Sequence, residues 1–497
     1  MQASCDHGGD DQIELHGIRQ MPAPTGPIVR WPWYLSCFKS RSVDRIRPDT
    51  HDHKRSSLAP TGPEDGRNRL MADRPFFSVL LPTRNRAQLL KFALQTALEQ
   101  DFKNYELVVS DNHSSDDTRQ IYRQLAGSQK NCRYVNPGRD LSMCEHWEYI
   151  LQQARGDYIL YLCDDDALAP NSLHILHQLI SQHPLEVLVW QRAYYHHPDV
   201  PERHKRGELR YELSSGKVTR YGTRQMISHF CKFDSDVHAH LPKMLNCAVS
   251  RDLIARCYQR SDVFFLPPFP DYSAACQLLA QSSSCHVLDL PIYICGVSAH
   301  SNAGIQYNRK QKFEDYLSLF DDNLLQHLRY PMRYLIGPYF LATQLQFHKL
   351  YPDKFPGSID YDAYFQTLFT ELALFAKTEP VGHELKSLRQ YMYDHYKENH
   401  PFQKLLRQHR LGLGKRWLRQ LSRTFPHVQR WGKSGEKLFR HLATNHLGKK
   451  RDPNQVAHQA ASSHEAAQIL AADLHRLTPG TFTILDNTGD ILTTEAA

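Results

Sequence analysis

The stretch FSVLLPTRNR, from Phe77 to Arg86, decides the fold class of this chain. Its first five residues form an unbroken apolar run that Pro82 closes, and polar residues follow at once. A short apolar run with such a boundary is typical of a strand that is buried on both faces. Apolar residues at helical spacing come next, between Leu89 and Leu98. The stretch therefore predicts a buried strand followed by a helix, which is the first half of a βαβ unit.

The same alternation of strands and helices continues downstream. Further strands are predicted at 106–109, 133–135 and 157–162, and helices at 118–126 and 143–154. Helices of this length between strands imply right-handed crossovers and a parallel sheet. Strand candidates at 186–190 and 286–288 lie in a more irregular stretch, and the pattern beyond Lys310 is mostly helical. We therefore expect an α/β fold with a mostly parallel sheet flanked by helices, followed by a mainly helical C-terminal region.

Changes in composition, and Pro and Gly residues that interrupt helices and strands, suggest four parts in the 497-residue chain. Residues 1–74, rich in Pro, Asp, His and Arg, are expected to be a disordered extension, and Met71 is an alternative start. Residues 75–305 hold the α/β domain, and residues 306–452 a helical, basic region. Residues 453–497 are interpreted as a tail with a helix and a hairpin-like stretch.

The overall composition is that of an ordinary globular protein, with 41% hydrophobic and 23% charged residues. A formal charge of +7 suits anionic partners without choosing among them. The 11 cysteines show no CxxC or zinc-like spacing, which indicates reduced thiols in a cytosolic compartment. No signal peptide and no long apolar run are visible. We expect a cytoplasmic protein, or one peripheral on the inner face of the membrane.

Polar residues follow three of the predicted strands at the point where each ends. These segments are Thr83–Arg86, Ser110–Asn112 and Asp164–Asp166. Ligands of open parallel sheets bind beyond the carboxyl ends of the strands. Carboxylates crowded at such an edge repel one another unless a cation or several donors balance them. Mg²⁺ or Mn²⁺ shared with substrate phosphates is the usual solution, so the sequence predicts a divalent metal site.

Three segments together resemble the family 2 glycosyltransferases: FSVLLPTRNR at 77–86, VVSDNHSSDDT at 108–118, and GDYI leading to LCDDD at 156–166. They follow one another in the order and at the spacing of the family. The resemblance covers about 77–305 and weakens after Trp190. It implies a GT-A fold and inverting transfer of a sugar from a nucleotide-diphosphate sugar to a hydroxyl of a glycan, a lipid-linked acceptor or an envelope polysaccharide.

The resemblance also implies roles for single residues. The nucleotide-sugar site would comprise Pro82, Thr83 and Arg86 around the base, Asp111 on the base, and Asp164 near the ribose. The metal would be held by Asp165, with Asp166 and, more weakly, His300 as further candidates. The first acid of the family's DxD motif is Cys163 here, which leaves open which aspartate of the run binds the ion.

Inverting transfer needs a general base that takes the proton of the acceptor hydroxyl. In the family this base is an aspartate at the start of a helix beyond the donor-binding core. The sequence PFPDY at 268–272 leads into an apolar helix, so Asp271 is the candidate. A helix N-terminus lowers the pKa of a carboxyl group, and we expect Asp271 to be ionised at neutral pH.

Each of these assignments has a structural alternative. The aspartate run fits a solvated turn, Asp111 an Asx turn, and Asp271 a helix cap. The Cys163 departure motivates an alternative function, a non-catalytic module that binds sugar nucleotides or glycans. Residues 404–451 carry 14 Lys and Arg against one acid, interleaved with apolar residues. This segment fits an anionic membrane surface or a solvated helical face, while no nucleic-acid motif accompanies it.

Overall fold

The computed structural model describes residues 74–299 apart from 213, 214, 235 and 268, together with 335–376, 381–409, 455–477 and 482–486. All of these lie in one compact unit, His53–Ala497. The predicted disordered extension, His300, most of the basic segment 404–451 and most of the hairpin-like stretch therefore lie outside the described residues.

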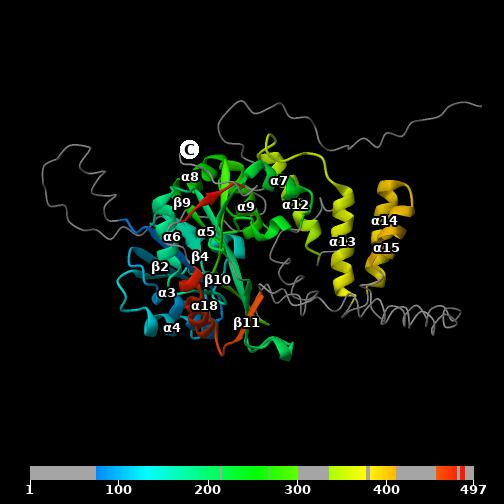
Figure 1. Cartoon of the computed structure of the whole chain (residues 1–497). Coiled ribbons are helices and arrows are strands. Elements are labelled where there is room, and N and C mark those ends of the chain that lie inside the picture. Colours follow the sequence, from blue (N-terminus) through cyan, green and yellow to red (C-terminus); the bar gives the residue numbers. More distant parts are fainter. Residues whose placement is uncertain are drawn as a thin grey trace, which may run out of the picture. The chain divides into compact units, whose positions relative to one another are not determined.

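The first half of the sheet follows the predicted alternation of strands and helices (Figure 1). Strands run parallel in the order β3-β2-β1-β4. All seven residues of β1 and of β2 are buried, which confirms that both faces of these strands are covered. The elements are β1 (Phe77–Thr83), α3 (Ala87–Leu98), β2 (Tyr105–Asp111), α4 (Thr118–Leu125), β3 (Cys132–Val135), α5 (Met143–Leu151) and β4 (Tyr158–Tyr161).

The second half makes the sheet mixed rather than mostly parallel. Strand β9 lies antiparallel between β4 and β6, whereas β10 runs parallel to β6. The elements are β5 (Ala167–Leu168), α6 (Ser172–Gln182), β6 (Val187–His196), η1 (Arg203–Lys205), β7 (Glu208–Glu212), β8 (Val218–Gly222), α7 (Thr223–Cys231), η2 (Asp236–Ala239), β9 (Cys247–Ser250), α8 (Arg251–Arg260), α9 (Pro270–Gln281) and β10 (Ser284–Val297).

Helices cover both faces of the sheet, as the α/β prediction requires. Alternate residues of β1, such as Val79 and Leu81, join a core that includes Leu90 and Leu94 of α3. On the opposite face α5 packs against β1, and α9 packs against α5 and α8. Because successive side chains of a strand point to opposite faces, one strand supplies both halves of the core.

The region after the sheet is helical, as predicted, with α12 (Gly337–Leu350), α13 (Tyr361–Phe375), α14 (Gly382–Tyr396) and α15 (His400–Gln408). Helix α12 packs against α9, and the rings of Phe269 and Tyr339 meet edge to face at 5.1 Å. Among the helices that the structure describes, none combines the length and apolar character needed to cross a membrane.

The C-terminal stretch is part of the sheet, which corrects its interpretation as a tail. It contains β11 (Gln455–Gln459), α18 (Ser463–Leu477) and β12 (Ile484–Leu485). Strand β11 pairs with β7, β12 pairs with β8, and α18 packs against β10 and α3 (Figure 1). The predicted helix is present, but the pairing of strands so distant in sequence leaves no local signal.

Truncating a core residue of α18 is expected to destabilise the whole sheet domain. Leu470 is fully buried among residues of the central core, so Leu470→Ala removes apolar contacts and leaves a cavity. We expect a loss of about 2–5 kcal/mol in the free energy of unfolding, measured by urea denaturation. Gln468→Ala, on the exposed side of the same helix, removes only an exposed hydrogen bond to Glu99 and should cost no more than about 1 kcal/mol. Equal effects of the two changes would show that α18 is not part of the core.

Candidate active site

Strands β1, β2 and β4 end at the same edge of the sheet, and the predicted site residues lie there. Thr83 is paired in register with Asp111, and Pro82 with Ser110. Strand β4 runs parallel on the other side of β1 and leads directly into the loop of residues 163–166. The structure thus brings together polar residues from three segments that span more than 80 positions of sequence.

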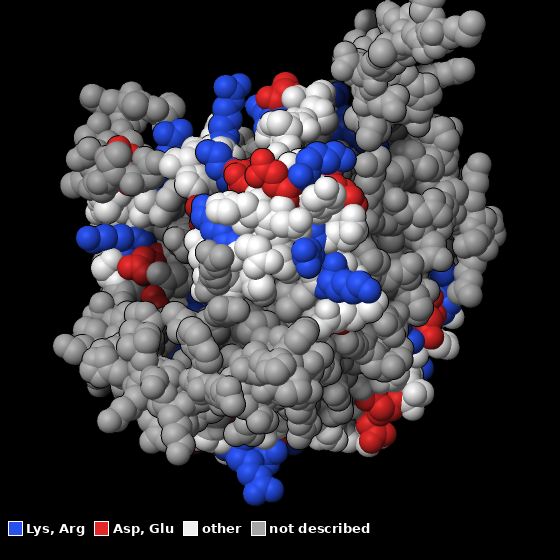
Figure 2. All heavy atoms as spheres, turned by 90° about the vertical axis from the view of Figure 1, so that its right-hand side faces the viewer, with Lys and Arg blue, Asp and Glu red and all other residues white. Residues whose placement is uncertain are grey.

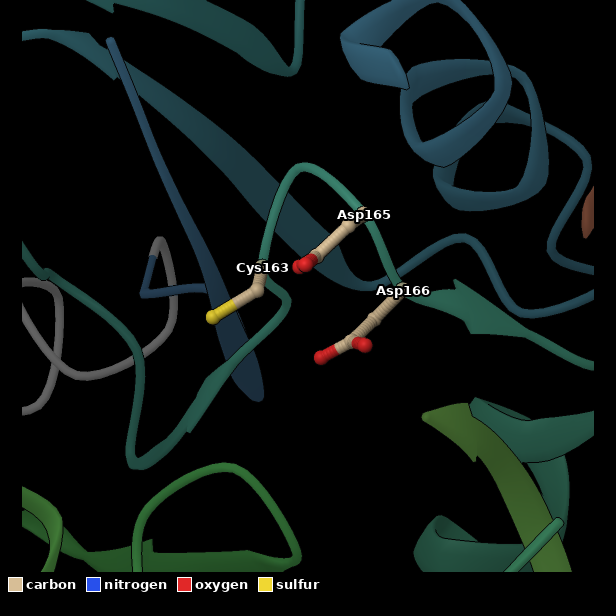
Figure 3. A group of neighbouring side chains, drawn as sticks. All are labelled: Cys163, Asp165 and Asp166. Carbon is tan, nitrogen blue, oxygen red and sulfur yellow. The ribbon is translucent and has the colours of Figure 1, made fainter. Parts of the chain in front are cut away.

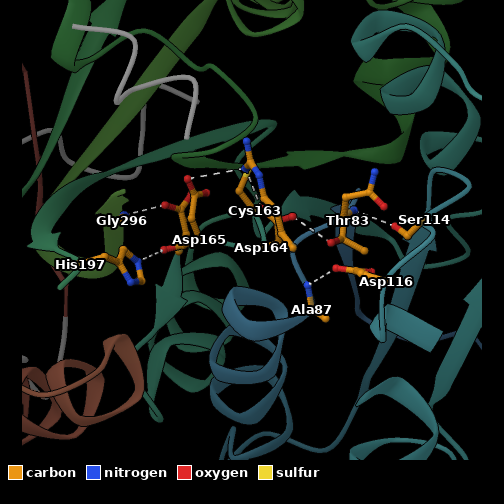
Figure 4. Close-up of polar contacts among 12 residues, drawn as sticks. Thr83, Ala87, Ser114, Asp116, Cys163, Asp164, Asp165, His197 and Gly296 are labelled. Atoms are coloured by element: carbon orange, nitrogen blue, oxygen red, sulfur yellow. Dashed lines mark hydrogen bonds and ion pairs between the residues drawn. The ribbon is translucent and has the colours of Figure 1, made fainter. Parts of the chain in front are cut away.

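Asp164 is bound by residues that follow β1 (Figure 4). The Thr83 hydroxyl donates to its Oδ2 at 2.8 Å, and the Arg86 guanidinium donates to its Oδ1 at 3.0 Å. Arg86 also lies 3.8 Å from a carboxylate oxygen of Asp165. Burial lowers the pKa of Arg86, but the two carboxylates outweigh it and raise this pKa above its usual range. Three of the predicted nucleotide-sugar residues therefore form one bonded group.

Asp111 organises the loop after β2. Its side chain is 3% exposed; one oxygen accepts the Ser114 backbone N–H at 2.9 Å, and the other accepts the Tyr134 hydroxyl. The local turn that was the structural alternative is therefore present. A carboxylate has about four acceptor positions, so two remain for a ligand. The turn and a contact to a nucleotide are compatible.

The loops after β1 and β2 are tied to each other. Asn85 and His113 both have positive φ angles, 51° and 56°. The Asn85 backbone N–H donates to the Ser114 hydroxyl at 2.8 Å, and its side-chain oxygen accepts the Ser115 backbone N–H at 2.8 Å. Backbone held in this sparsely populated region is common at binding sites. The mutual bonds fix the walls of the predicted base pocket.

Cys163, Asp165 and Asp166 form a group that fits a metal ion. Their ligand atoms all lie within 4.8 Å of one another, and the side chains project from a single loop (Figure 3). Asp165 and Asp166 were the predicted metal residues, whereas Cys163 was noted only as a departure. Asp164 points instead toward Thr83 and Arg86. Two neighbouring carboxylates suit a hard divalent ion, so these residues fit the metal that the sequence predicts.

Asp166 is held firmly from the adjacent strand β10. It accepts the Tyr293 hydroxyl at 2.5 Å and the Gly296 backbone N–H at 2.7 Å. Burial and the neighbouring Asp165 carboxylate raise the pKa of Asp166 well above its usual range. Like charges at this distance need a cation to be ionised together. The electrostatics of the loop therefore favour a bound cation.

Gly296 and His197 support the loop. The sequence did not predict this role for either residue, although the run Tyr194–His197 could be interpreted as a strand end or as part of an acceptor cleft. The His197 ring contacts the Asp165 carbonyl oxygen at 2.9 Å (Figure 4). A Cβ atom at position 296 would lie 1.7 Å from the same oxygen, so only glycine fits there. An isolated glycine inside a strand pattern signals close backbone approach, and that signal was available at ICGV, 294–297.

Asp271 lies in the first turn of α9, as predicted, but its expected pKa was wrong. Burial raises the pKa of Asp271, although the nearby Lys243 ammonium and backbone N–H groups oppose this. Desolvation of the carboxylate thus outweighs the favourable helix terminus. A raised pKa makes the carboxylate a stronger base as long as it remains ionised. Lys243 and Arg192, the cations that act on Asp271, were not predicted from the sequence.

Comparison with known proteins agrees with this geometry. Residues 78–240 match the sequence model of glycosyl transferase family 2, a span that contains the strand-edge residues from Thr83 to Asp166. These residues therefore form a family 2 glycosyltransferase domain.

Curated relatives share this part of the chain. One is the GalNAc(5)-diNAcBac-PP-undecaprenol beta-1,3-glucosyltransferase of Campylobacter jejuni, 36% identical over 105 residues, or 21% of this chain and 34% of that protein. Another is the putative colanic acid biosynthesis glycosyl transferase WcaA of Escherichia coli, 29% identical over 21% of this chain and 38% of that protein. The chain therefore matches little more than a third of the length of these relatives.

Among solved structures, the TarS protein of Staphylococcus aureus (residues 1–349, in complex with UDP-GlcNAc) aligns with 68% of this chain and 93% of its own. The sequence identity is 16% and the TM-score 0.41. The family assignment accordingly rests on the sequence match and on the strand-edge residues.

Proposed function

We propose that this protein is an inverting glycosyltransferase that moves a sugar from a nucleotide-diphosphate sugar to a hydroxyl of a glycan or lipid-linked acceptor, in the biosynthesis of a polysaccharide. The observation that carries the proposal is the strand edge itself. In a family 2 domain, the bonded group of Thr83, Arg86 and Asp164 lies next to the Cys163, Asp165 and Asp166 group.

Each residue at the strand edge would contact a different part of the nucleotide-sugar donor. Pro82, Thr83 and Arg86 would line the base pocket, Asp111 would accept a base N–H, and Asp164 would bind a ribose hydroxyl. Asp165 and Asp166, with the Cys163 thiol beside them, would hold a Mg²⁺ or Mn²⁺ ion. Such an ion, when bound, neutralises the charge of the diphosphate leaving group. Arg86 balances the charges of the Asp164 and Asp165 carboxylates.

Asp271 would act as the base. It would accept the proton of the acceptor hydroxyl as the oxygen attacks the anomeric carbon and the nucleotide diphosphate departs from the opposite face. Burial strengthens the carboxylate as a base, and Lys243 keeps the charged form accessible. The helix that carries Asp271 is packed against α5, α7, α8 and α12, so the group is held in place.

Asp271→Asn is expected to stop transfer without weakening donor binding. The amide keeps the shape of the side chain but accepts no proton, so kcat should fall by about 10²–10⁴-fold. The rate of transfer from a nucleotide sugar and the affinity for the nucleotide, by calorimetry, are measured together. Asp262→Asn, an exposed residue just before the same segment, is the matched control and should behave as wild type. Full activity of Asp271→Asn would remove the residue from catalysis.

A non-catalytic sugar-nucleotide or glycan-binding module is the second candidate, and Cys163 is the observation that favours it. A thiol replaces the first acid of the family motif, and burial together with the three aspartates raises its pKa well above the usual range. A neutral thiol contributes less to a hard cation than a carboxylate. Nucleotide binding by calorimetry without release of free nucleotide diphosphate from any of the donors UDP-, GDP- and dTDP-sugar would support this candidate.

Membrane association is proposed for the basic segment 404–451, on the cytoplasmic side. The described part of the face in Figure 2 carries Lys and Arg side chains interspersed with Asp and Glu, rather than a field of one sign. We expect the protein to pellet with anionic vesicles at low salt and to be released at high salt, because exposed charges are screened. Deletion of 411–451 should abolish pelleting. Equal pelleting with neutral vesicles would contradict the electrostatic account.

A further inference from the structure

Two cationic side chains, Lys243 and Arg192, act on the Asp271 carboxylate. Ala193 and Tyr195 of β6 belong to the core that α3 and α18 cover. Because side chains alternate along a strand, Arg192 and Tyr194 point to the opposite face. The Arg192 guanidinium lies 5.7 Å from the centre of the Tyr194 ring, and Tyr194 is 41% exposed.

Lys243 reaches the same place from the loop before β9. It is only 6% exposed, its Nζ donates to the Tyr272 hydroxyl at 3.2 Å, and it lies 4.5 Å from the centre of the Tyr272 ring. Burial and the neighbouring Arg192 lower the pKa of Lys243 to about 8, so the ammonium is still mostly charged at neutral pH. Arg192 and Lys243 are thus close enough to repel each other.

The loop that carries Lys243 is rigid. Asn246 is fully buried, accepts the Lys243 backbone N–H at 3.0 Å and donates to the Leu241 carbonyl at 3.1 Å. Met244 has a positive φ of 64°, a conformation that is uncommon for a side chain of its size. Strain of this kind persists where the surroundings fix the backbone, and it is concentrated at functional sites.

No carboxylate makes direct contact with either cation among the described residues. Among the residues that the structure describes, neither Arg192 nor Lys243 forms an ion pair, although Asp271 and Asp166 both act on the pair over a longer range. A buried ammonium with one neutral hydrogen-bond partner is costly unless a ligand compensates for it. Arg192 also lies near the metal group, because it pairs in register with Tyr293 of β10, whose hydroxyl donates to Asp166.

We propose that Arg192 and Lys243 form a phosphate-binding site between the metal group and the base Asp271. A guanidinium fork and an ammonium are the side chains that recognise phosphate oxygens, and the rigid loop and strand hold them in advance. The proposal rests on the proposed function in one respect: it assigns a ligand inside the same active site. The phosphate is either the terminal phosphate of the donor's diphosphate or a phosphate group of the acceptor.

Two binding measurements test the site and separate these sources. The nucleoside diphosphate that binds most tightly among UDP, GDP and dTDP is titrated with Mn²⁺ by calorimetry, alongside its monophosphate. Inorganic phosphate is then titrated into protein saturated with that diphosphate. The variants are Lys243→Met and Arg192→Met; Lys232→Met and Arg224→Met, exposed residues of the α7 segment, are the matched controls. Thermal unfolding of each variant verifies that it is folded.

A donor phosphate in the site predicts that both variants lose about tenfold or more in diphosphate affinity, with monophosphate affinity unchanged. An acceptor phosphate predicts unchanged diphosphate affinity and loss of inorganic phosphate binding to the saturated protein. Variants that match the controls in both titrations would overturn the proposal. If the wild type binds no nucleotide, the proposed function fails, and titration of inorganic phosphate alone into wild type and variants still decides whether the site exists.

Discussion

Replacing Gly296 with alanine is expected to weaken donor binding and to slow transfer strongly. The new Cβ would lie 1.7 Å from the Asp165 carbonyl oxygen and 2.8 Å from the His197 ring, so the aspartate loop must move. The same strand position supplies the N–H that holds Asp166. A shift of about 1 Å in such a group costs on the order of 100-fold in rate. We expect at least that loss in kcat/KM and weaker stabilisation by nucleotide in thermal unfolding.

Gly222→Ala is the control for this change. No atom lies within 4 Å of a Cβ at that position, and its φ of −70° suits any residue. The control should therefore keep the activity of the wild type, with at most a small loss of stability because Ala is a poorer cap than Gly for α7. Wild-type nucleotide affinity in folded Gly296→Ala protein would show that the close approach of β10 to the aspartate loop does not determine the site.

Asp165→Asn is expected to remove the metal dependence of nucleotide binding and to reduce kcat/KM by about 10²–10³-fold, the range seen when one electrostatic group of an active site is lost. The amide keeps the size of the side chain, while the charge that faces Arg86 and the metal group disappears. Binding of nucleoside diphosphate is measured by calorimetry with and without Mn²⁺. The wild type should bind more tightly with the ion, and the variant should not respond to it.

Asp101→Asn, at an exposed position after α3, serves as the control and should respond to Mn²⁺ as the wild type does. A full Mn²⁺ response in Asp165→Asn would assign the ion to other residues. Asp166→Asn is less informative, because Asp166 also accepts the Tyr293 hydroxyl and the Gly296 N–H, and its loss would disturb the loop itself.

The sequence predicted the parallel half of the fold because its signal is local. The apolar run at Phe77–Leu81 and the helical spacing after it correspond to β1 and α3. The strand-edge residues followed from the same reasoning, since parallel strands place their carboxyl ends together. Gly156 of the GDYI motif lies at the opposite edge, before β4, where a Cβ would lie 2.5 Å from the Ser78 backbone nitrogen.

Features that depend on distant contacts were not predictable in the same way. The pairing of β11 with β7 joins positions more than 240 residues apart, and short polar strands such as QVAHQ carry no apolar alternation. The roles within the aspartate run also depend on tertiary structure. Thr83 and Arg86 donate hydrogen bonds to Asp164, whereas the Gly296 N–H of β10 donates to Asp166. The pKa of Asp271 was predicted in the wrong direction because sequence shows the helix terminus but not the burial.

At the centre of the proposed function, Asp165 and Asp166 in the loop after β4 hold a divalent cation that binds the donor diphosphate. Thermal unfolding of the full chain with UDP, GDP or dTDP, each with and without Mn²⁺, tests it most directly. We expect one of the three nucleotides to raise the melting temperature of the protein, and Mn²⁺ to raise it further. In Asp165→Asn, the addition of Mn²⁺ should give no further rise. Stabilisation by no nucleotide, or equal stabilisation with and without the ion in wild type and variant, would contradict it.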